Sequence, residues 1–249
     1  MTGTRHCIFT GITLGLLLAA RHDGHAQSSG VGARRADLPQ SKGEAGWLRQ
    51  MGEQQGVVTD SRYDVIFIGD SLTEFWTSIG KASWPEKFAP LKCANCGISG
   101  DRTEHILYRI EHLDFRRAAP RAFVLLMGTN NLGMEKPDEP EEVVRAILKA
   151  AASLTKRHPQ SQIIILDIPP SGIAADTPLR LNIKRTNTLL AKAVLPARAS
   201  LLSLHDAFMD DAGRWREGLT LDGTHFSATG YAKLAELLAP KLKELPGAK

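Results

Sequence analysis

Three side chains that could form a nucleophilic relay lie near opposite ends of this 249-residue chain. Ser71 follows Gly69 and Asp70 at the end of an apolar run, where a strand is expected to turn into a loop or helix. Asp222 and His225 are spaced so that a carboxylate and an imidazole can meet within one turn. Asp222 could then hold the tautomer of His225 while the other ring nitrogen takes a proton from Ser71. Turns favour serine for structural reasons, so Ser71 alone is weak evidence for catalysis. The hypothesis of acyl transfer therefore depends on the Asp222–His225 pair.

An acyl-transfer serine also needs hydrogen-bond donors for the negative charge that develops on the substrate oxygen. Two segments offer such donors, NCGISGDRT at 95–103 and GTNN at 128–131. In the first, the amide of Gly97 has no side chain to obstruct it, and in the second, Asn130 supplies a side-chain amide. With the amide of Ser71, these groups would form an oxyanion hole of three donors.

Strand and helix patterns alternate from Tyr63 onward, and these elements must position the candidate groups. Apolar runs of strand length lie at 64–69, 91–95, 122–127, 162–168 and 199–204. Helical periods lie at 102–113, with Asp101 as the expected N-cap, from Pro140, at 179–194 and at 228–242. Several strands are apolar on both faces, as expected for parallel strands between helices. The sequence therefore predicts an α/β fold, with function at the carboxyl ends of the strands.

The N-terminal segment has the pattern of a targeting signal. Residues 1–26 combine a positive start, an apolar run of about 14 residues at 7–20 and small residues before a cut, so we expect a signal peptide. An uncleaved anchor is the alternative, because Arg21 delays the small residues. Residues 27–46 are rich in Gly, Ser and charged residues, which predicts a flexible leader. A single domain is expected at 47–249. We expect a periplasmic or secreted protein without a stable membrane span after cleavage.

The charge and cysteine content exclude several classes of protein. The chain carries 31 basic and 27 acidic residues without a basic stripe, so nucleic acid is not an expected partner. Three cysteines cannot form a disulfide scaffold. Cys93 and Cys96 would lie about 10 Å apart along a strand, so we expect buried thiols, with a disulfide in a kinked strand end as the alternative. The oligomeric state stays open, and a homodimer is possible.

Other side chains have a structural and a functional interpretation. Asp70 is expected to brace the turn at Ser71 through backbone hydrogen bonds. Trp76 and Trp84 could form the floor of an acyl or sugar site, or they could pack in the core. Arg102 and Arg109 could rim the crevice, or be solvated helix charges. His205, with Asp206, is the rival to His225 as catalytic base.

The blocks GDSL at 69–72, NxGxSGDRT at 95–103, GTNN at 128–131 and DGTH at 222–225 resemble those of the SGNH (GDSL) hydrolases. Within them, the chain most resembles the platelet-activating factor acetylhydrolase catalytic subunits and their bacterial relatives, although Asn131 replaces the Asp of many members. The resemblance implies a flavodoxin-like α/β/α fold with five parallel strands in the order 2-1-3-4-5, and no metal or cofactor. It assigns the nucleophile to Ser71, the base to His225, its orienting carboxylate to Asp222 and the oxyanion donors to Ser71, Gly97 and Asn130.

The sequence thus leads us to expect an exported serine esterase that acts on short-chain esters, above all acetyl groups on a carbohydrate or similar polar carrier. A lysophospholipase, thioesterase or acyltransferase on the same triad is the alternative among enzymes. A non-catalytic glycan- or lipid-binding protein is the alternative from another class. Since histidine changes its charge between about pH 5 and 8, esterase activity should decline below about pH 6.

Overall fold

A computed structural model describes residues 35–88 and 91–245 of the chain. The predicted signal peptide and the first part of the predicted leader, residues 1–34, lie outside the described residues. The main helices are α1 (Ala45–Asp60), α2 (Ser71–Glu74), α3 (Ser83–Phe88), α4 (Thr103–His112), α5 (Thr129–Leu132), α6 (Pro140–Arg157), α7 (Pro178–Lys192) and α8 (Ala228–Lys243). The strands are β1 (Val65–Gly69), β2 (Cys93–Gly97), β3 (Ala122–Leu126), β4 (Gln162–Leu166) and β5 (Ala199–Leu202), and η1 (Phe75–Thr77) and η2 (His205–Phe208) are short 3-10 helices.

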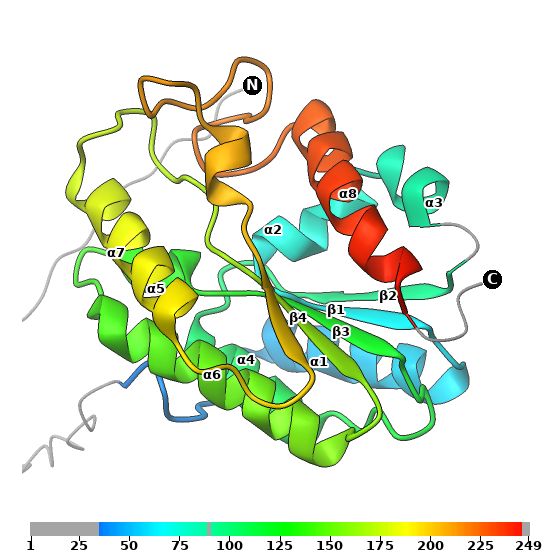
Figure 1. Cartoon of the computed structure of the whole chain (residues 1–249). Helices are drawn as coiled ribbons and strands as arrows, with labels where there is room; N and C mark the ends of the chain where they lie inside the picture. Colours follow the sequence, from blue (N-terminus) through cyan, green and yellow to red (C-terminus); the bar gives the residue numbers. More distant parts are fainter. Residues whose placement is uncertain (1–34, 89–90, 246–249) are drawn as a thin grey trace, which may run out of the picture. The chain divides into compact units, whose positions relative to one another are not determined.

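The five strands form one parallel sheet in the order β2-β1-β3-β4-β5, which confirms the predicted topology (Figure 1). Gly69 at the end of β1 is level with Gly97 on one side and Leu126 on the other. The carboxyl ends of these three strands therefore lie side by side at one edge of the sheet. The loops that follow them carry Ser71, the 98–102 segment and Asn130.

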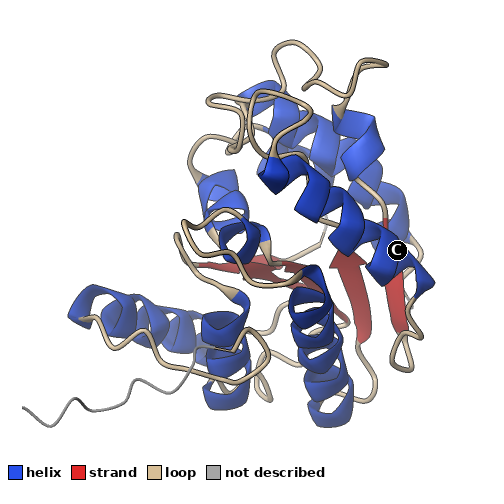
Figure 2. Ribbon diagram, turned by 90° about the vertical axis from the view of Figure 1, so that its left-hand side faces the viewer, coloured by secondary structure: helices blue, strands red, loops and turns tan. Residues whose placement is uncertain are grey.

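Each face of the sheet is covered by helices, as Figures 1 and 2 show. Side chains alternate between the faces of a strand, so Ile66 and Ile68 of β1 join the core under α1, α4, α6 and α7. Val65 and Phe67 join the second core, with α3 and α8. Both cores are apolar, which explains the continuous apolar runs of the strands.

The helix stripes read from the sequence are confirmed on α4 and α8. Their buried members are Ile106, Leu107, Ile110, Tyr231, Leu234, Ala235, Leu238 and Leu242. The prediction that Asp101 caps α4 was wrong, because Arg102 is the N-cap residue and its backbone N–H donates to His105 Nδ1. The carboxylate of Asp101 is instead bound by side chains from elsewhere in the chain, described below.

The chain packs against the domain well before Trp47. Ala36 is fully buried, and its carbonyl accepts a hydrogen bond of 2.7 Å from Thr103 Oγ1. The backbone N–H of Gln40 donates to the carbonyl of Glu104 at 3.0 Å. Ala36 and Gln40, which fall in the segment predicted to be a flexible leader, are therefore bound to α4. Over the described ranges, we find no helix with the length and apolarity that crossing a bilayer requires.

Candidate active site

The turn between β1 and α2 places Ser71 at the edge of the sheet. Ser71 is the first residue of α2, and Asp70 is the N-cap residue. A side chain at Gly69 would be impossible, since its Cβ would lie 2.1 Å from Thr73 Oγ1 and 2.5 Å from the Leu126 carbonyl. The glycine thus allows α2 to turn back directly over the strand end. This close turn presents the Ser71 side chain beyond the sheet.

Asp70 braces this turn, as predicted from the sequence, since its Oδ1 accepts the N–H of Leu72 at 2.9 Å. The carboxyl is almost completely buried, and its Oδ2 has no hydrogen-bond partner among the described residues. Burial raises the pKa of Asp70 to about 7; the Leu72 N–H lowers it, and the nearby carboxylate of Asp101 raises it further. Asp70 is therefore a buried carboxyl whose pKa lies well above its usual range.

The structure brings Ser71, His225 and Asp222 together in a continuous relay. Ser71 Oγ lies 3.0 Å from His225 Nε2, although the two residues are 154 positions apart in the sequence. His225 Nδ1 lies 2.7 Å from Asp222 Oδ2. The other carboxylate oxygen, Oδ1, accepts the backbone N–H groups of Thr224 and His225 at 2.9 and 2.8 Å. The carboxylate is thus held in place, and it can orient the imidazole toward the serine.

Hydrogen bonds keep the carboxylate of Asp222 ionised. Partial burial acts to raise its pKa, but the hydrogen bonds from the His225 ring and from the N–H groups of His225 and Thr224 outweigh this and lower it to about 2. An ionised Asp222 favours the His225 tautomer that carries its proton on Nδ1. The Nε2 atom is then a free acceptor for the Ser71 hydroxyl.

The loop that carries Asp222 and His225 is stabilised from both sides. Thr220 Oγ1 donates to the carbonyl of His225 and accepts the N–H of Gly223, both at 2.9 Å. The Gly223 carbonyl accepts the N–H of Gly172 at 2.7 Å. Gly223 has a φ of +87°, which favours glycine at this point of the turn.

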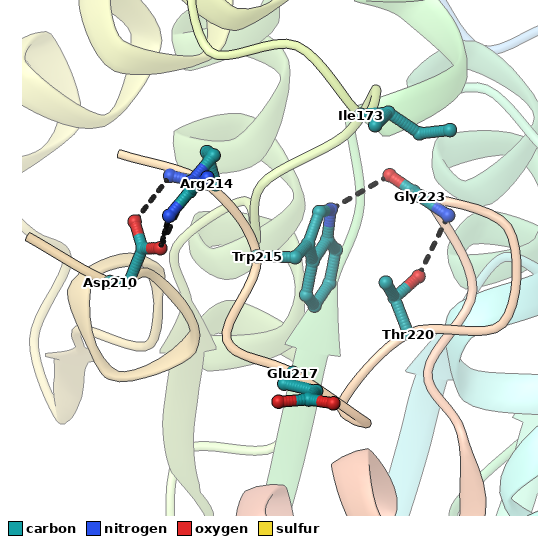
Figure 3. A pocket seen from close by; sticks show the side chains of 7 residues that line it. All are labelled: Ile173, Asp210, Arg214, Trp215, Glu217, Thr220 and Gly223. Carbon is teal, nitrogen blue, oxygen red and sulfur yellow. Dashed lines mark hydrogen bonds and ion pairs between the residues drawn. The ribbon is translucent and has the colours of Figure 1, made fainter. Parts of the chain in front are cut away.

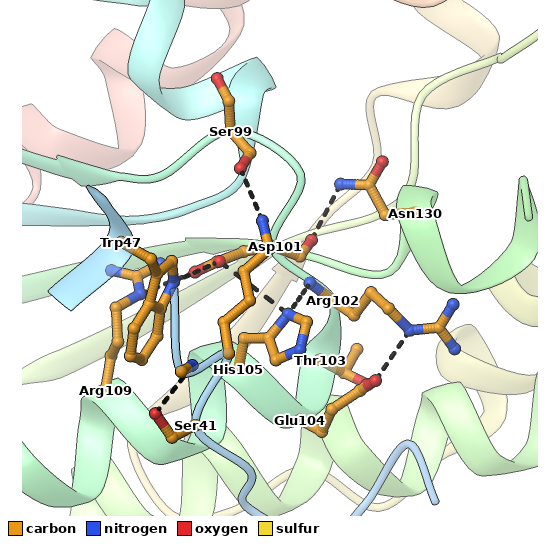
Figure 4. A network of polar contacts seen from close by, with 12 residues as sticks. Ser41, Trp47, Ser99, Asp101, Arg102, Thr103, Glu104, His105, Arg109 and Asn130 are labelled. Carbon is orange, nitrogen blue, oxygen red and sulfur yellow. Dashed lines mark hydrogen bonds and ion pairs between the residues drawn. The ribbon is translucent and has the colours of Figure 1, made fainter. Parts of the chain in front are cut away.

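Two of the three predicted oxyanion donors are available at the site. As the first residue of a helix, Ser71 has a backbone N–H without an intrahelical acceptor. Asn130, in α5, donates one N–H of its side chain to the carbonyl of Asp101 at 2.8 Å (Figure 4). Because a side-chain amide has two N–H groups, the second remains for a ligand.

The Gly97 amide, the third predicted donor, faces another direction. Its N–H donates to Asn95 Oδ1 at 2.9 Å, and its carbonyl accepts from Gln54 Nε2 at 3.0 Å. Since the next residue, Ile98, donates its N–H to β1, the backbone of Gly97 points to the outer edge of β2. A Cβ here would lie 2.3 Å from the backbone nitrogen of Glu74, so close packing of α2 on β2 accounts for the glycine.

Gly100 offers a further backbone N–H near Asn130, which was not predicted from the sequence. It has a φ of +72° in a turn closed by the hydrogen bond from the Asp101 N–H to the Ile98 carbonyl. Asn130 binds the carbonyl of Asp101, the residue directly after Gly100. Within the described part of the chain, the Gly100 N–H has no acceptor. The glycine of the SGD triplet at 99–101 was the available signal, but its orientation depends on the turn.

Arg109 ties the turn of Ser71 to the loop of Asp101 through Gly69, and Figure 4 shows its side chain beside the Asp101 carboxylate. It is fully buried, which corrects the expectation of a solvated or crevice-rim arginine. Its Nε donates to Asp101 Oδ2 at 2.7 Å, and its other nitrogens donate to the carbonyls of Cys96 and Gly69 at 2.7 and 2.8 Å. Trp47 Nε1 donates to the second carboxylate oxygen of Asp101 at 2.7 Å. One buried ion pair therefore fixes both loops.

Arg102 and His205 also have structural surroundings. Arg102 is buried and pairs with Glu104 at 2.7 Å and with Asp138, so it does not rim the crevice either. His205 is buried, and its Nδ1 lies 3.1 Å from the carbonyl of Ile168. Ser71 contacts His225 and not His205, so the geometry favours His225 as the base.

The remaining candidates belong to the core. Trp76 is buried against Trp84 and Phe88, with ring centroids 5.5 and 5.2 Å away. These contacts favour a packing role for Trp76 over a role in the floor of a substrate site. Cys93 and Cys96 are free thiols, and burial raises the pKa of each to about 12. Residues 35–88 and 91–245 contain no cluster of three or more His, Cys, Asp or Glu side chains that could hold a metal ion.

Comparisons with known proteins agree with this fold. The model of the GDSL-like Lipase/Acylhydrolase family matches residues 67–233. The chain is 32% identical over 211 residues to the rat platelet-activating factor acetylhydrolase IB subunit alpha2, which covers 82% of this chain and 89% of the relative. It is 33% identical over 187 residues to the alpha1 subunit from Pongo abelii, which covers 75% of this chain and 78% of the relative.

Solved structures share the fold at lower sequence identity. A putative acylhydrolase from Bacteroides fragilis has a TM-score of 0.65 at 18% identity, covering 79% of this chain and 96% of its own. A mutant of an acetylxylan esterase from Geobacillus stearothermophilus has a TM-score of 0.55 at 17% identity, covering 73% of this chain and 94% of its own. The fold and these comparisons define a hydrolase that acts on esters. The chain belongs to the GDSL-like lipase/acylhydrolase family, the SGNH hydrolases.

Proposed function

We propose that this protein is an exported serine esterase that removes acetyl groups from a carbohydrate or similar polar carrier. The observation that carries the proposal is the relay of 3.0 Å from Ser71 Oγ to His225 Nε2 and 2.7 Å from His225 Nδ1 to Asp222 Oδ2. These distances meet the requirement for a nucleophile, its base and an orienting group.

In this proposal, Ser71 Oγ attacks the ester carbonyl as His225 Nε2 takes the hydroxyl proton. His225 then returns the proton to the leaving alcohol, and the acyl group stays on Ser71. Water then attacks the acyl-enzyme as the same nitrogen takes its proton, and His225 returns that proton to Ser71 Oγ as the acid leaves. We assign the oxyanion donors to the N–H groups of Ser71 and Gly100 and to the side chain of Asn130, because the Gly97 N–H is bound to Asn95.

The names of similar proteins support an acetyl substrate. The curated relatives are named acetylhydrolases, and one solved neighbour is named an acetylxylan esterase. The carriers implied by these names differ, a phospholipid in one case and a polysaccharide in the other. A phospholipid carrier is therefore the second candidate, favoured by the higher sequence identity of the acetylhydrolase subunits. The proposed export rests on the pattern of residues 1–26.

Hydrolysis of p-nitrophenyl esters tests the activity and the acyl length. We expect kcat/KM to be at least tenfold higher for the acetate than for the octanoate. Release of acetate from acetylated xylo-oligosaccharide, compared with release from a short-chain acetyl phospholipid, tests the carrier. Ser71→Ala should abolish both activities, while Ser78→Ala, at an exposed serine nearby, serves as the matched control. Activity retained by Ser71→Ala would refute the proposed nucleophile.

A further inference from the structure

A pocket of about 400 Å³ lies against the loop that carries Asp222 and His225. Its walls include Trp215, the Asp210–Arg214 pair and Glu217, with Gly223 on the side of the catalytic loop (Figure 3). The volume is within the range of about 300–1,000 Å³ that is typical of small-ligand sites. No residue of the proposed relay or oxyanion hole lines this pocket, so the proposed chemistry does not account for it.

Trp215 is held rigidly in this pocket. Its indole N–H donates to the carbonyl of Gly223 at 2.9 Å. The rings of Phe208 and Phe226 contact it nearly at right angles, at 75° and 79°, with centroids 5.9 and 6.0 Å away. The side chain is only half-buried and lines the pocket. The indole N–H is already satisfied, so what Trp215 offers a ligand is chiefly apolar aromatic surface.

Polar groups surround this aromatic surface. Asp210 and Arg214 form an ion pair with two contacts, at 3.1 Å from Nε and 3.0 Å from Nη2. Glu217 is exposed and has no partner within the part of the chain that the structure describes. Figure 3 shows the indole between the Asp210–Arg214 pair and the Thr220–Gly223 turn, with Glu217 below it. The unpaired carboxylate gives the wall an excess of negative charge, which disfavours a phosphate group.

A neutral sugar ring fits this combination of surfaces. The C–H groups on one face of the ring can pack on an indole, while the hydroxyls at its edge bind carboxylate and guanidinium groups. Gly223 directly follows Asp222, whose carboxylate binds the ring of His225 at 2.7 Å, and the other nitrogen of that ring lies 3.0 Å from Ser71 Oγ. The pocket therefore adjoins the loop that carries two members of the proposed relay.

We propose that this pocket is a carrier subsite, which binds a neutral sugar residue of the substrate with Trp215 as its stacking surface and Glu217 as a hydroxyl acceptor. The assignment rests on the proposed function, because it names the carrier of the ester that Ser71 attacks. It predicts that the enzyme distinguishes neutral glycans from phospholipids through the carrier and not through the acetyl group.

Calorimetric titration of the Ser71→Ala protein tests this subsite without turnover. The probes are xylotriose, cellotriose and N,N′,N″-triacetylchitotriose, three neutral trisaccharides. We expect at least one to bind, and we expect Glu217→Ala, added to Ser71→Ala, to weaken that binding at least threefold. Trp215→Ala should weaken it at least tenfold, with partial rescue in Trp215→Phe. Glu236→Ala, at an exposed acid on α8, is the matched control and should bind as the parent does.

Two results would overturn the assignment. One is the absence of binding by all three trisaccharides, and the other is binding that neither the Trp215 nor the Glu217 variants weaken. Competition by dibutyryl phosphatidylcholine that depends on Trp215 would assign the pocket to a lipid instead. Hydrolysis of p-nitrophenyl acetate by the wild type reports on the proposed function independently. If the wild type hydrolyses the ester but binds no trisaccharide, the subsite is refuted and the proposed function stands. If it binds a trisaccharide but hydrolyses no ester, the proposed function is refuted.

Discussion

Substitution of Asp70 by Asn should remove a large part of the pH dependence of stability. Burial raises the pKa of this carboxyl from 3.8 to about 7. The folded protein therefore binds a proton that the unfolded chain releases, over the window between these two values. Stability from this group is full below about pH 4 and is lost as the pH rises through about 7. Asn is neutral throughout, and its carbonyl oxygen can still accept the N–H of Leu72.

The size of the effect follows from the two pKa values. A raised carboxyl pKa of this size makes the free energy of unfolding about 3 kcal/mol lower at pH 8 than at pH 5. Urea denaturation at both values measures it, and Asp70→Asn should lack this contribution. Ser71→Ala, which alters the next residue but keeps the carboxyl, should retain the wild-type difference. If Asp70→Asn and the wild type showed the same change between pH 5 and 8, the buried carboxyl would not be the group that titrates.

Three further predictions concern the site. Asn130→Ala should lower kcat for p-nitrophenyl acetate by about 10²–10³ with little change in KM, because it removes a proposed oxyanion donor; an unchanged kcat would exclude that role. Arg109→Met should lower the free energy of unfolding by about 3–5 kcal/mol, since it leaves Asp101 buried without its counter-charge; a loss below about 1 kcal/mol in a urea titration would contradict this. Esterase activity should decline in acid, below about pH 6, because a histidine base that carries a proton cannot accept the serine proton, whereas Asp222, with a pKa lowered to about 2, stays ionised in this range. A pH profile that stays flat down to pH 4 would contradict the assignment of the base.

The sequence predicts well those features that depend on local periodicity. The apolar stripes of α4 and α8 and the continuous apolar strands indicate their buried faces directly. The edge strand β2 was placed two residues too early, at 91–95 instead of Cys93–Gly97. Its burial is only partial, and its bounds are set by pairing with β1, with Gly97 level with Gly69. A register of this kind is a property of two segments and cannot be read from one.

The candidate active site likewise has residues that could be predicted from sequence motifs and residues whose contacts depend on the fold. The residues proposed for the relay were predicted from their motifs, and the structure places Ser71, His225 and Asp222 within hydrogen-bond distance of one another. Arg109 was expected either to rim the crevice or to be a solvated helix charge, yet its partners are the carbonyls of Gly69 and Cys96 and the carboxylate of Asp101. Such contacts arise only from tertiary packing. The direction of the Gly97 amide likewise depends on which side of β2 faces β1.

Fluorophosphonate labelling followed by mass spectrometry of the peptides tests whether Ser71 is a nucleophile activated by His225. We expect one covalent adduct on Ser71 in the wild type, none in Ser71→Ala, and labelling at least a hundredfold slower in His225→Ala. A label on another residue, or an undiminished rate in the absence of His225, would contradict it.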